Sequence, residues 1–136
     1  MRPKNVEVEK AGGQRPREAQ QRVPQAGEIW WLSLDPTKGH EQAGFRPVVV
    51  LSPAGMNGPT RRIIGVPVTT SLATPGTARA RMQVPLQGLP RACAALPDQV
   101  TTLDWTARIA EFRSEQASEH ELMEIRVRVK AVCGID

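Results

Sequence analysis

The apolar residues of this chain come in short runs that prolines and glycines interrupt. Four of these runs are rich in β-branched, aromatic or alternating apolar residues, and they cover residues 28–34, 47–52, 62–68 and 81–86. Residues 92–95 and 99–103 are shorter candidates of the same kind. Runs of this length, bounded by turn-forming residues, are typical of β-strands. The pattern therefore predicts a small sheet of short strands.

Proline and side-chain alternation add detail to these strands. Pro47 has no amide hydrogen to donate to a neighbouring strand, so we expect it at the start of its strand. Asn57-Gly58-Pro59 is typical of a turn. Alternation places two sets of side chains on single faces: Ile64, Val66 and Val68 in the third strand, and Met82, Val84 and Leu86 in the fourth.

One segment near the C-terminus has the features of a helix. Ser118 followed by Glu121 forms a capping box, and Gly134 supplies a stop. Several short strands with one terminal amphipathic helix predict a mainly β fold, a strongly bent sheet or barrel on which the helix packs. The apolar residues at helical spacing are Leu122, Ile125, Val129 and Val132.

The chain of 136 residues has room for one domain. Residues 1–26 hold glycine, proline and charged side chains with few large apolar groups, so we interpret them as a flexible basic tail and residues 27–136 as the domain. The net charge of +4 divides into +3 in the tail, −2 from Glu28 and Asp35, +6 between residues 36 and 97, and −3 after them. A basic centre with an acidic end fits a face that binds a polyanion, and scattered solvated arginines fit equally well.

Several classes of protein are disfavoured by the sequence. No apolar run approaches the roughly 20 residues of a membrane-spanning helix, and the N-terminus leads into charged sequence, so we expect a cytoplasmic protein without membrane contact. Cys93 and Cys133 are expected to be free thiols, and His40 and His120 stand too far apart to suggest a metal site. We expect no metal and no cofactor. Five aromatic residues are too few for a platform that stacks several bases.

A dense polar loop, residues 35–46, leads directly into the second apolar run, and Thr69-Thr70-Ser71 follows the third. If these strands pair antiparallel, Arg46 and Thr69 lie at the same end of the sheet. An arginine beside a hydroxyl suits a phosphodiester, because the guanidinium fork matches two phosphate oxygens. The alternative is an arginine that satisfies loop carbonyls beside a threonine that ends a strand.

Three segments carry a resemblance to a known family. They are Gly27-Glu28-Ile29-Trp30, then Asp35-Pro36-Thr37-Lys38-Gly39-His40-Glu41-Gln42-Ala43-Gly44-Phe45-Arg46-Pro47 running on through residue 53, and Val66-Pro67-Val68-Thr69-Thr70. Leu96-Pro97-Asp98-Gln99-Val100 and Leu103-Asp104-Trp105 extend the match. Residues 27 to 134 resemble the MazF/PemK (Kid) family of toxin endoribonucleases. The resemblance implies an SH3-like β-barrel with a C-terminal helix, the fold of MazF, PemK and CcdB, assembled as a homodimer.

The activity that the resemblance implies is metal-independent, sequence-specific cleavage of single-stranded RNA. Attack by the adjacent ribose 2′-OH would leave a 2′,3′-cyclic phosphate and a 5′-OH, and cutting mRNA in this way would inhibit translation and growth. The implied regulator is a MazE/PemI-like antitoxin of a type II toxin-antitoxin system, whose extended acidic segment covers the RNA groove. Contact with DNA is expected only indirectly, through the antitoxin.

Site residues carry over by position. Arg46 and Thr69 match the family's catalytic arginine and threonine, and Glu41 matches an acidic residue assigned to the active site in some members. Arg46 would stabilise charge on the pentacoordinate phosphorus or donate a proton, although a guanidinium is a poor acid. Thr69 would hold a nonbridging oxygen, and Glu41 is the candidate base, with His40 next. The candidates for RNA contact are Lys38, His40, Gln42, Phe45, Thr70, Arg79, Arg81, Asp98 and Gln99.

Two features depart from the family pattern. Phe45 stands at a position that is polar in some members, and residues 74–81 differ from the loop that many members carry, so the sequence at which RNA is cut does not carry over. Two other functions stay open. One is a non-enzymatic topoisomerase inhibitor like the CcdB poisons on the same fold, and the other is a catalytically weak RNA-binding module.

Overall fold

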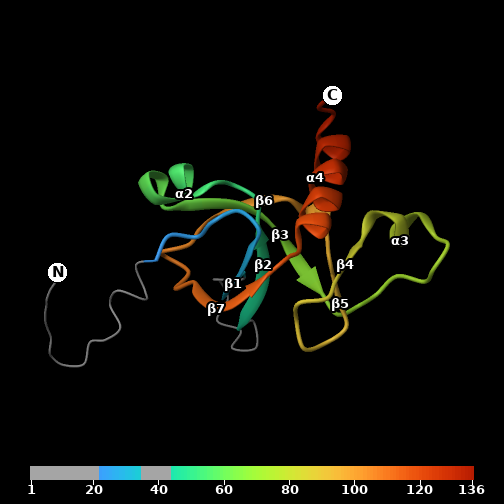
Figure 1. Cartoon of the computed structure of the whole chain (residues 1–136), viewed down its shortest axis with the longest axis horizontal. Helices are drawn as coiled ribbons and strands as arrows, with labels where there is room; N and C mark the ends of the chain where they lie inside the picture. Colours follow the sequence, from blue (N-terminus) through green and yellow to red (C-terminus); the bar gives the residue numbers. More distant parts are fainter. Residues whose placement is uncertain (1–21, 35–43) are drawn as a thin grey trace, which may run out of the picture.

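The computed structural model describes residues 22–34 and 44–136, in which an antiparallel sheet curls around two small cores (Figure 1). The spatial order of strands is β4-β5-β3-β2-β1-β7, and β6 also pairs with β3. This curled sheet with a C-terminal helix confirms the predicted mainly β fold. The strands are β1 (Glu28–Ser33), β2 (Phe45–Val50), β3 (Arg62–Thr69), β4 (Val84–Leu86), β5 (Cys93–Ala95), β6 (Thr101–Asp104) and β7 (Glu111–Gln116). The helices are α2 (Ala54–Thr60), α3 (Ala78–Met82), the 3-10 turn η3 (Pro97–Gln99) and α4 (Glu119–Cys133).

Both faces of the central strands are buried, because successive side chains point to opposite sides. Ile29 of β1 belongs to a cluster that includes Ile125 of α4, and this helix stands against the sheet in Figure 1. Trp30 belongs to the other cluster, where its ring lies 6.0 Å from that of Trp105 and 5.3 Å from that of Phe112. Burying an apolar side chain of this size contributes roughly 1.5–3 kcal/mol. The two clusters therefore hold β1 and its neighbours rigidly.

The helix α4 forms as the sequence predicts. The Ser118 hydroxyl accepts from the Glu121 amide, and the Glu121 carboxylate accepts from the Ser118 amide. Gly134 ends the helix at φ 71°, where a side chain would be unfavourable. Ile125 is fully buried, whereas Val132 is 43% exposed and lies outside the packed face.

Pro47 is the third residue of β2, so its predicted place at the start of the strand is wrong. The paired residues of β2 and β3 begin at Val48, opposite Pro67. The Leu51 amide donates to the Ile64 carbonyl of β3. The backbone hydrogen-bonding groups of a strand alternate between its two neighbours, so those of Pro47 also face β3. It lies beyond the last paired residue there, and its missing amide hydrogen breaks no bond.

Two segments are helical where the sequence suggested otherwise. Asn57-Gly58-Pro59 lies inside α2 rather than in a turn, because the buried Asn57 side chain bonds to Ser52 and Pro24 and stabilises this short helix. Arg81 and Met82 belong to α3, capped by the Thr77 hydroxyl, and the fourth strand begins only at Val84. Ile64, Val66 and Val68 do share one side of β3, but Ile64 is 37% exposed. The strand β7 was not predicted, because its residues are mostly polar and exposed.

The first residues that the structure describes, from residue 22 on, already contact the rest of the domain. Pro24 is buried, and its carbonyl accepts from Asn57 Nδ2 at 2.8 Å. Arg22 pairs with the buried Glu28 carboxylate and lies 4.5 Å from the centre of the Phe112 ring. Residues 22 to 26, assigned to the tail from sequence, therefore contact the domain, and the division at residue 27 stays a prediction.

Within residues 22–34 and 44–136, no helix has the length and apolar character needed to cross a membrane. The same residues contain no group of three or more His, Cys, Asp or Glu side chains placed to hold a metal ion.

Candidate functional site

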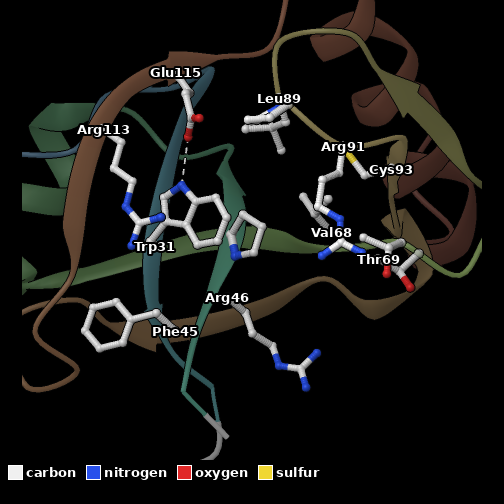
Figure 2. Close-up of a pocket in the computed structure, with 13 residues that line it drawn as sticks. Trp31, Phe45, Arg46, Val68, Thr69, Leu89, Arg91, Cys93, Arg113 and Glu115 are labelled. Atoms are coloured by element: carbon white, nitrogen blue, oxygen red, sulfur yellow. Dashed lines mark hydrogen bonds between the residues drawn. The ribbon is translucent and has the colours of Figure 1, made fainter. Parts of the chain in front are cut away.

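A pocket of about 440 Å³ opens where β1, β2, β3 and β7 meet the chain before β5 (Figure 2). This volume is in the range of small-ligand sites. Three arginines and one glutamate give its described walls a positive balance, which suits an anionic ligand. The lining residues are Trp31, Phe45, Arg46, Pro47, Val68, Thr69, Thr70, Leu89, Pro90, Arg91, Cys93, Arg113 and Glu115.

Strand register brings Arg46 and Thr69 to this pocket. Val48 pairs with Pro67 and Val49 with Val66, so continuing by two residues sets Arg46 opposite Thr69. The paired residues of β2 and β3 end at Val48 and Pro67, short of that point, while Thr69 pairs with Ala94 of β5. The strands separate here, and both side chains line the opening.

The Thr69 hydroxyl is oriented by its own backbone. Its oxygen accepts the Ser71 amide at 2.9 Å. Because the oxygen is the acceptor in that bond, its proton remains available to a ligand. The following chain is held by the buried Gln83, whose side chain accepts from the Ala73 amide and donates to the Ser71 carbonyl.

The loop between β4 and β5 carries Arg91 to the pocket. The backbone amide of Gln87 donates to Glu121 Oε2 at 2.9 Å, so the same carboxylate that caps α4 also anchors this loop. A Cβ on Gly88 would lie 2.9 Å from the Gln116 carbonyl oxygen, so glycine permits the loop to approach β7 closely. In Figure 2, Arg91 points toward Thr69.

An irregularity in β7 aims Arg113 and Glu115 at the pocket. Trp30 pairs with Phe112 and Ile29 with Glu115, so Arg113 and Ser114 are extra residues in the ladder. Ser114 takes φ 62°, the left-handed conformation that bulges often require. The Arg113 guanidinium carbon lies 4.2 Å from the centre of the Trp31 ring. Trp31 Nε1 in turn donates to Glu115 Oε1 at 2.8 Å.

Cys93 is buried at the wall of the pocket. Burial raises the pKa of this thiol, and the negative charges of Glu121 and Glu115 raise it further. The protonated thiol is therefore favoured at neutral pH, and it is a poor nucleophile. Cys133 is also free, as predicted, and is exposed.

The structure brings only part of the predicted site together. Arg46, Thr69, Phe45 and Thr70 all line the pocket. Arg79 and Arg81 lie on α3, and Asp98 and Gln99 on η3, and none of these four lines it. Lys38, His40, Glu41 and Gln42 lie outside the described residues.

Four polar or aromatic residues of the pocket were not among the predicted site residues. Arg91 was counted only as one charge of the basic centre, and Trp31 only as part of a strand. Arg113 and Glu115 belong to the strand that was not predicted. The alternation Glu111, Arg113, Glu115 was the one available sign that these side chains share a face.

Comparisons with known proteins by sequence and by structure agree on one family. Residues 25–133 match the model of the family described as PemK-like, MazF-like toxin of type II toxin-antitoxin system. The chain is 42% identical over 112 residues to the endoribonuclease toxin MazF of Escherichia coli K12, covering 82% of this chain and 96% of that one. It is 38% identical over 106 residues to the Escherichia coli endoribonuclease PemK, covering 78% and 79%.

Two crystal structures from Deinococcus radiodurans share the fold. MazF matches with a TM-score of 0.69 and 36% identity, covering 84% of this chain and 99% of that one. A MazE–MazF complex matches with a TM-score of 0.71 and 33% identity, covering 85% and 100%. The curled sheet, the C-terminal helix and the matched 109-residue span together confirm the family prediction. The chain belongs to the PemK-like, MazF-like toxin family of type II toxin-antitoxin systems.

Proposed function

We propose that the chain is an endoribonuclease toxin that cuts single-stranded RNA, mRNA included, and that the pocket of Figure 2 is its active site. The single observation that carries the proposal is the shared position of Arg46 and Thr69 at the separating ends of β2 and β3. The names of the MazF and PemK relatives support the same activity.

The chemistry proposed for the site is an in-line attack by the ribose 2′-OH on the adjacent phosphorus. The products are a 2′,3′-cyclic phosphate and a 5′-OH. Arg46, an exposed cation that lines the pocket, stabilises the charge that builds up on the phosphoryl oxygens. Thr69 donates its hydroxyl proton to a nonbridging oxygen, the direction that its bond from Ser71 leaves open.

Arg91 extends this proposal. It comes from a different loop, points toward Thr69 in Figure 2, and adds a second guanidinium at the same end of the pocket. Two guanidinium groups around one phosphodiester hold it by several charged hydrogen bonds. Glu41 as the general base, with His40 next, stays a proposal from the sequence, since both lie outside the described residues.

The test is cleavage of a long single-stranded RNA by purified protein in EDTA. We expect products with 2′,3′-cyclic phosphate ends. Arg46→Ala and Thr69→Val each remove a hydrogen bond to a charged group, about 1.5–3 kcal/mol, so each should lower kcat/KM by roughly tenfold or more. Arg62→Ala is the matched control, because Arg62 is exposed at the far end of β3, opposite Asp104, and should leave the rate unchanged.

Three other results would count against the proposed function or against the proposed active site. RNA left intact while the protein inhibits gyrase supercoiling would favour the CcdB-like alternative. Salt-dependent RNA binding without products would favour the weak binding module. Cleavage that Arg46→Ala leaves unchanged would place the catalytic centre elsewhere.

Two partners complete the proposal. A MazE-like antitoxin covers the pocket with an acidic segment, which the excess of arginine in its walls favours. A second copy of the chain packs on apolar side chains that one copy leaves exposed, among them Met123 at 50% and Val127 at 56% on α4. Sedimentation of wild type against Val127→Glu should show a dimer that the substitution weakens.

A further inference from the structure

The two ends of the pocket differ in chemistry. Arg46, Arg91 and Thr69 lie toward one end of it in Figure 2, and Glu115 lies toward the other with Trp31 between. The first end has cations and a hydroxyl, which suit a phosphate. The second end has an aromatic ring and the only carboxylate among the described lining residues. A carboxylate repels phosphate, so the second end calls for a ligand group of another kind.

Trp31 offers a flat surface at this second end. Trp30 and Trp105 are 1% and 5% exposed, whereas Trp31 is half-buried and lines the pocket. The Arg113 guanidinium lies over the ring of Trp31 and stays 44% exposed in its side chain. Indole rings and guanidinium planes are the surfaces on which unpaired nucleic acid bases stack.

Glu115 is fixed at the edge of that surface. Its Oε1 accepts from Trp31 Nε1 at 2.8 Å, and none of the described hydrogen bonds uses Oε2. The left-handed Ser114 and the ladder irregularity place Glu115 opposite Ile29, one residue before Trp30. A half-buried carboxylate held in place by one bond is a strong acceptor for a donor edge.

We propose that Trp31, Arg113 and Glu115 form a subsite that reads one unpaired guanine of the RNA. Guanine places two adjacent donors, N1–H and the N2 amino group, on one edge, and a carboxylate accepts both. Adenine and cytosine each place an acceptor beside their amino group, and uracil flanks its N3–H with two carbonyls. The inference rests on the proposed function for its substrate and adds to it a specificity determinant away from Arg46 and Thr69.

The first experiment sequences the ends that the protein generates from a randomised RNA pool. Wild type should show guanine enriched roughly tenfold at one fixed distance from the cut. Glu115→Gln keeps an acceptor for Trp31 but puts an amide donor against the donors of guanine, so that position should lose its guanine preference while the other positions keep theirs. Glu111→Gln is the matched control, since Glu111 pairs with Arg113 on the same strand but does not line the pocket.

The second experiment needs no cleavage. Trp31 fluorescence reports binding of two fully 2′-O-methylated heptamers, seven uridines and the same sequence with a central guanosine, because the other two tryptophans are buried. The guanosine heptamer should bind several-fold tighter to wild type and to Glu111→Gln, and Glu115→Gln should abolish the difference.

The outcomes separate the two proposals. RNA cleavage with a guanine preference that Glu115→Gln leaves intact, or that Glu111→Gln removes as well, overturns the subsite and leaves the ribonuclease standing. Equal binding of the two heptamers, or binding of neither, also overturns the subsite. Guanosine-selective binding without any cleavage overturns the ribonuclease and supports the subsite.

Discussion

Replacing Asn57 by alanine tests how much the buried hydrogen bonds of this side chain, away from the pocket, contribute to the free energy of unfolding. Asn57 is fully buried. Its Nδ2 donates to the carbonyls of Pro24 and Ser52 at 2.8 and 2.9 Å, and its Oδ1 accepts from Ser52 Oγ at 2.6 Å. Alanine supplies none of these bonds, so two carbonyls and one hydroxyl lose a partner in the interior.

The expected loss in the free energy of unfolding follows from the number of hydrogen bonds that the substitution removes. Each lost bond lowers the free energy of unfolding by about 0.5–1.5 kcal/mol, and more where the group left behind stays dry. Ser52 Oγ retains the Ile64 amide as a donor at 2.8 Å and has the Ile64 carbonyl within 3.5 Å, so its share is the smallest. We expect a total of about 2–4 kcal/mol, a large part of the 5–15 kcal/mol typical of a domain.

The assay is urea unfolding followed by tryptophan fluorescence, which the buried Trp30 and Trp105 report. Thr60→Ala is the control on the same helix, because Thr60 is exposed and its loss should change stability by at most about 0.5–1 kcal/mol. RNA cleavage by folded Asn57→Ala should match wild type, since Asn57 does not line the pocket. A loss no larger than that of Thr60→Ala would refute this account of α2.

Three further predictions concern single residues. Gly65→Ala would place a Cβ 2.6 Å from the Val49 carbonyl oxygen, and such overpacking should lower the free energy of unfolding by about 1–3 kcal/mol in the same assay. Ser118→Ala removes the N-terminal cap of α4 and should lower the free energy of unfolding by about 1 kcal/mol in urea. An unchanged free energy of unfolding would show that the cap is dispensable. The Ala107 amide and the Thr106 hydroxyl lower the pKa of Asp104, so its contribution to stability is present above the unfolded pKa and is lost as pH falls through the lowered value. Unfolding of wild type and Asp104→Asn should therefore differ at pH 7 and converge in acid, and a constant difference would contradict this.

Much of the fold could be predicted from local signals. The capping box at Ser118 and Glu121 and the stop at Gly134 are short-range features that fix a helix within a few residues. The runs that became β1 and β3 are apolar enough to be recognised without their partners. Antiparallel pairing of β2 and β3 was a condition of the sequence argument; the two strands do pair in this way, and Arg46 and Thr69 line one pocket.

The remaining elements depend on contacts that a local pattern does not contain. Asn57 is helical because Pro24, 33 positions earlier, supplies a partner for its side chain. The strand β7 is polar and exposed, and only pairing with β1 makes it a strand. Its irregularity, which aims Arg113 and Glu115, has no signature in the residue types around Ser114, since a left-handed serine is an outcome of the whole ladder.

The two extra residues in β7 lie outside the pairing that holds this strand to β1. The paired residues on either side hold the strand to β1, while Arg113 and Ser114 pair with no residue of β1. Substitution at Arg113 alters the surface next to Trp31 without removing a strand pair. The side chains beside Trp31 and the pairing of β7 with β1 can therefore change independently of each other.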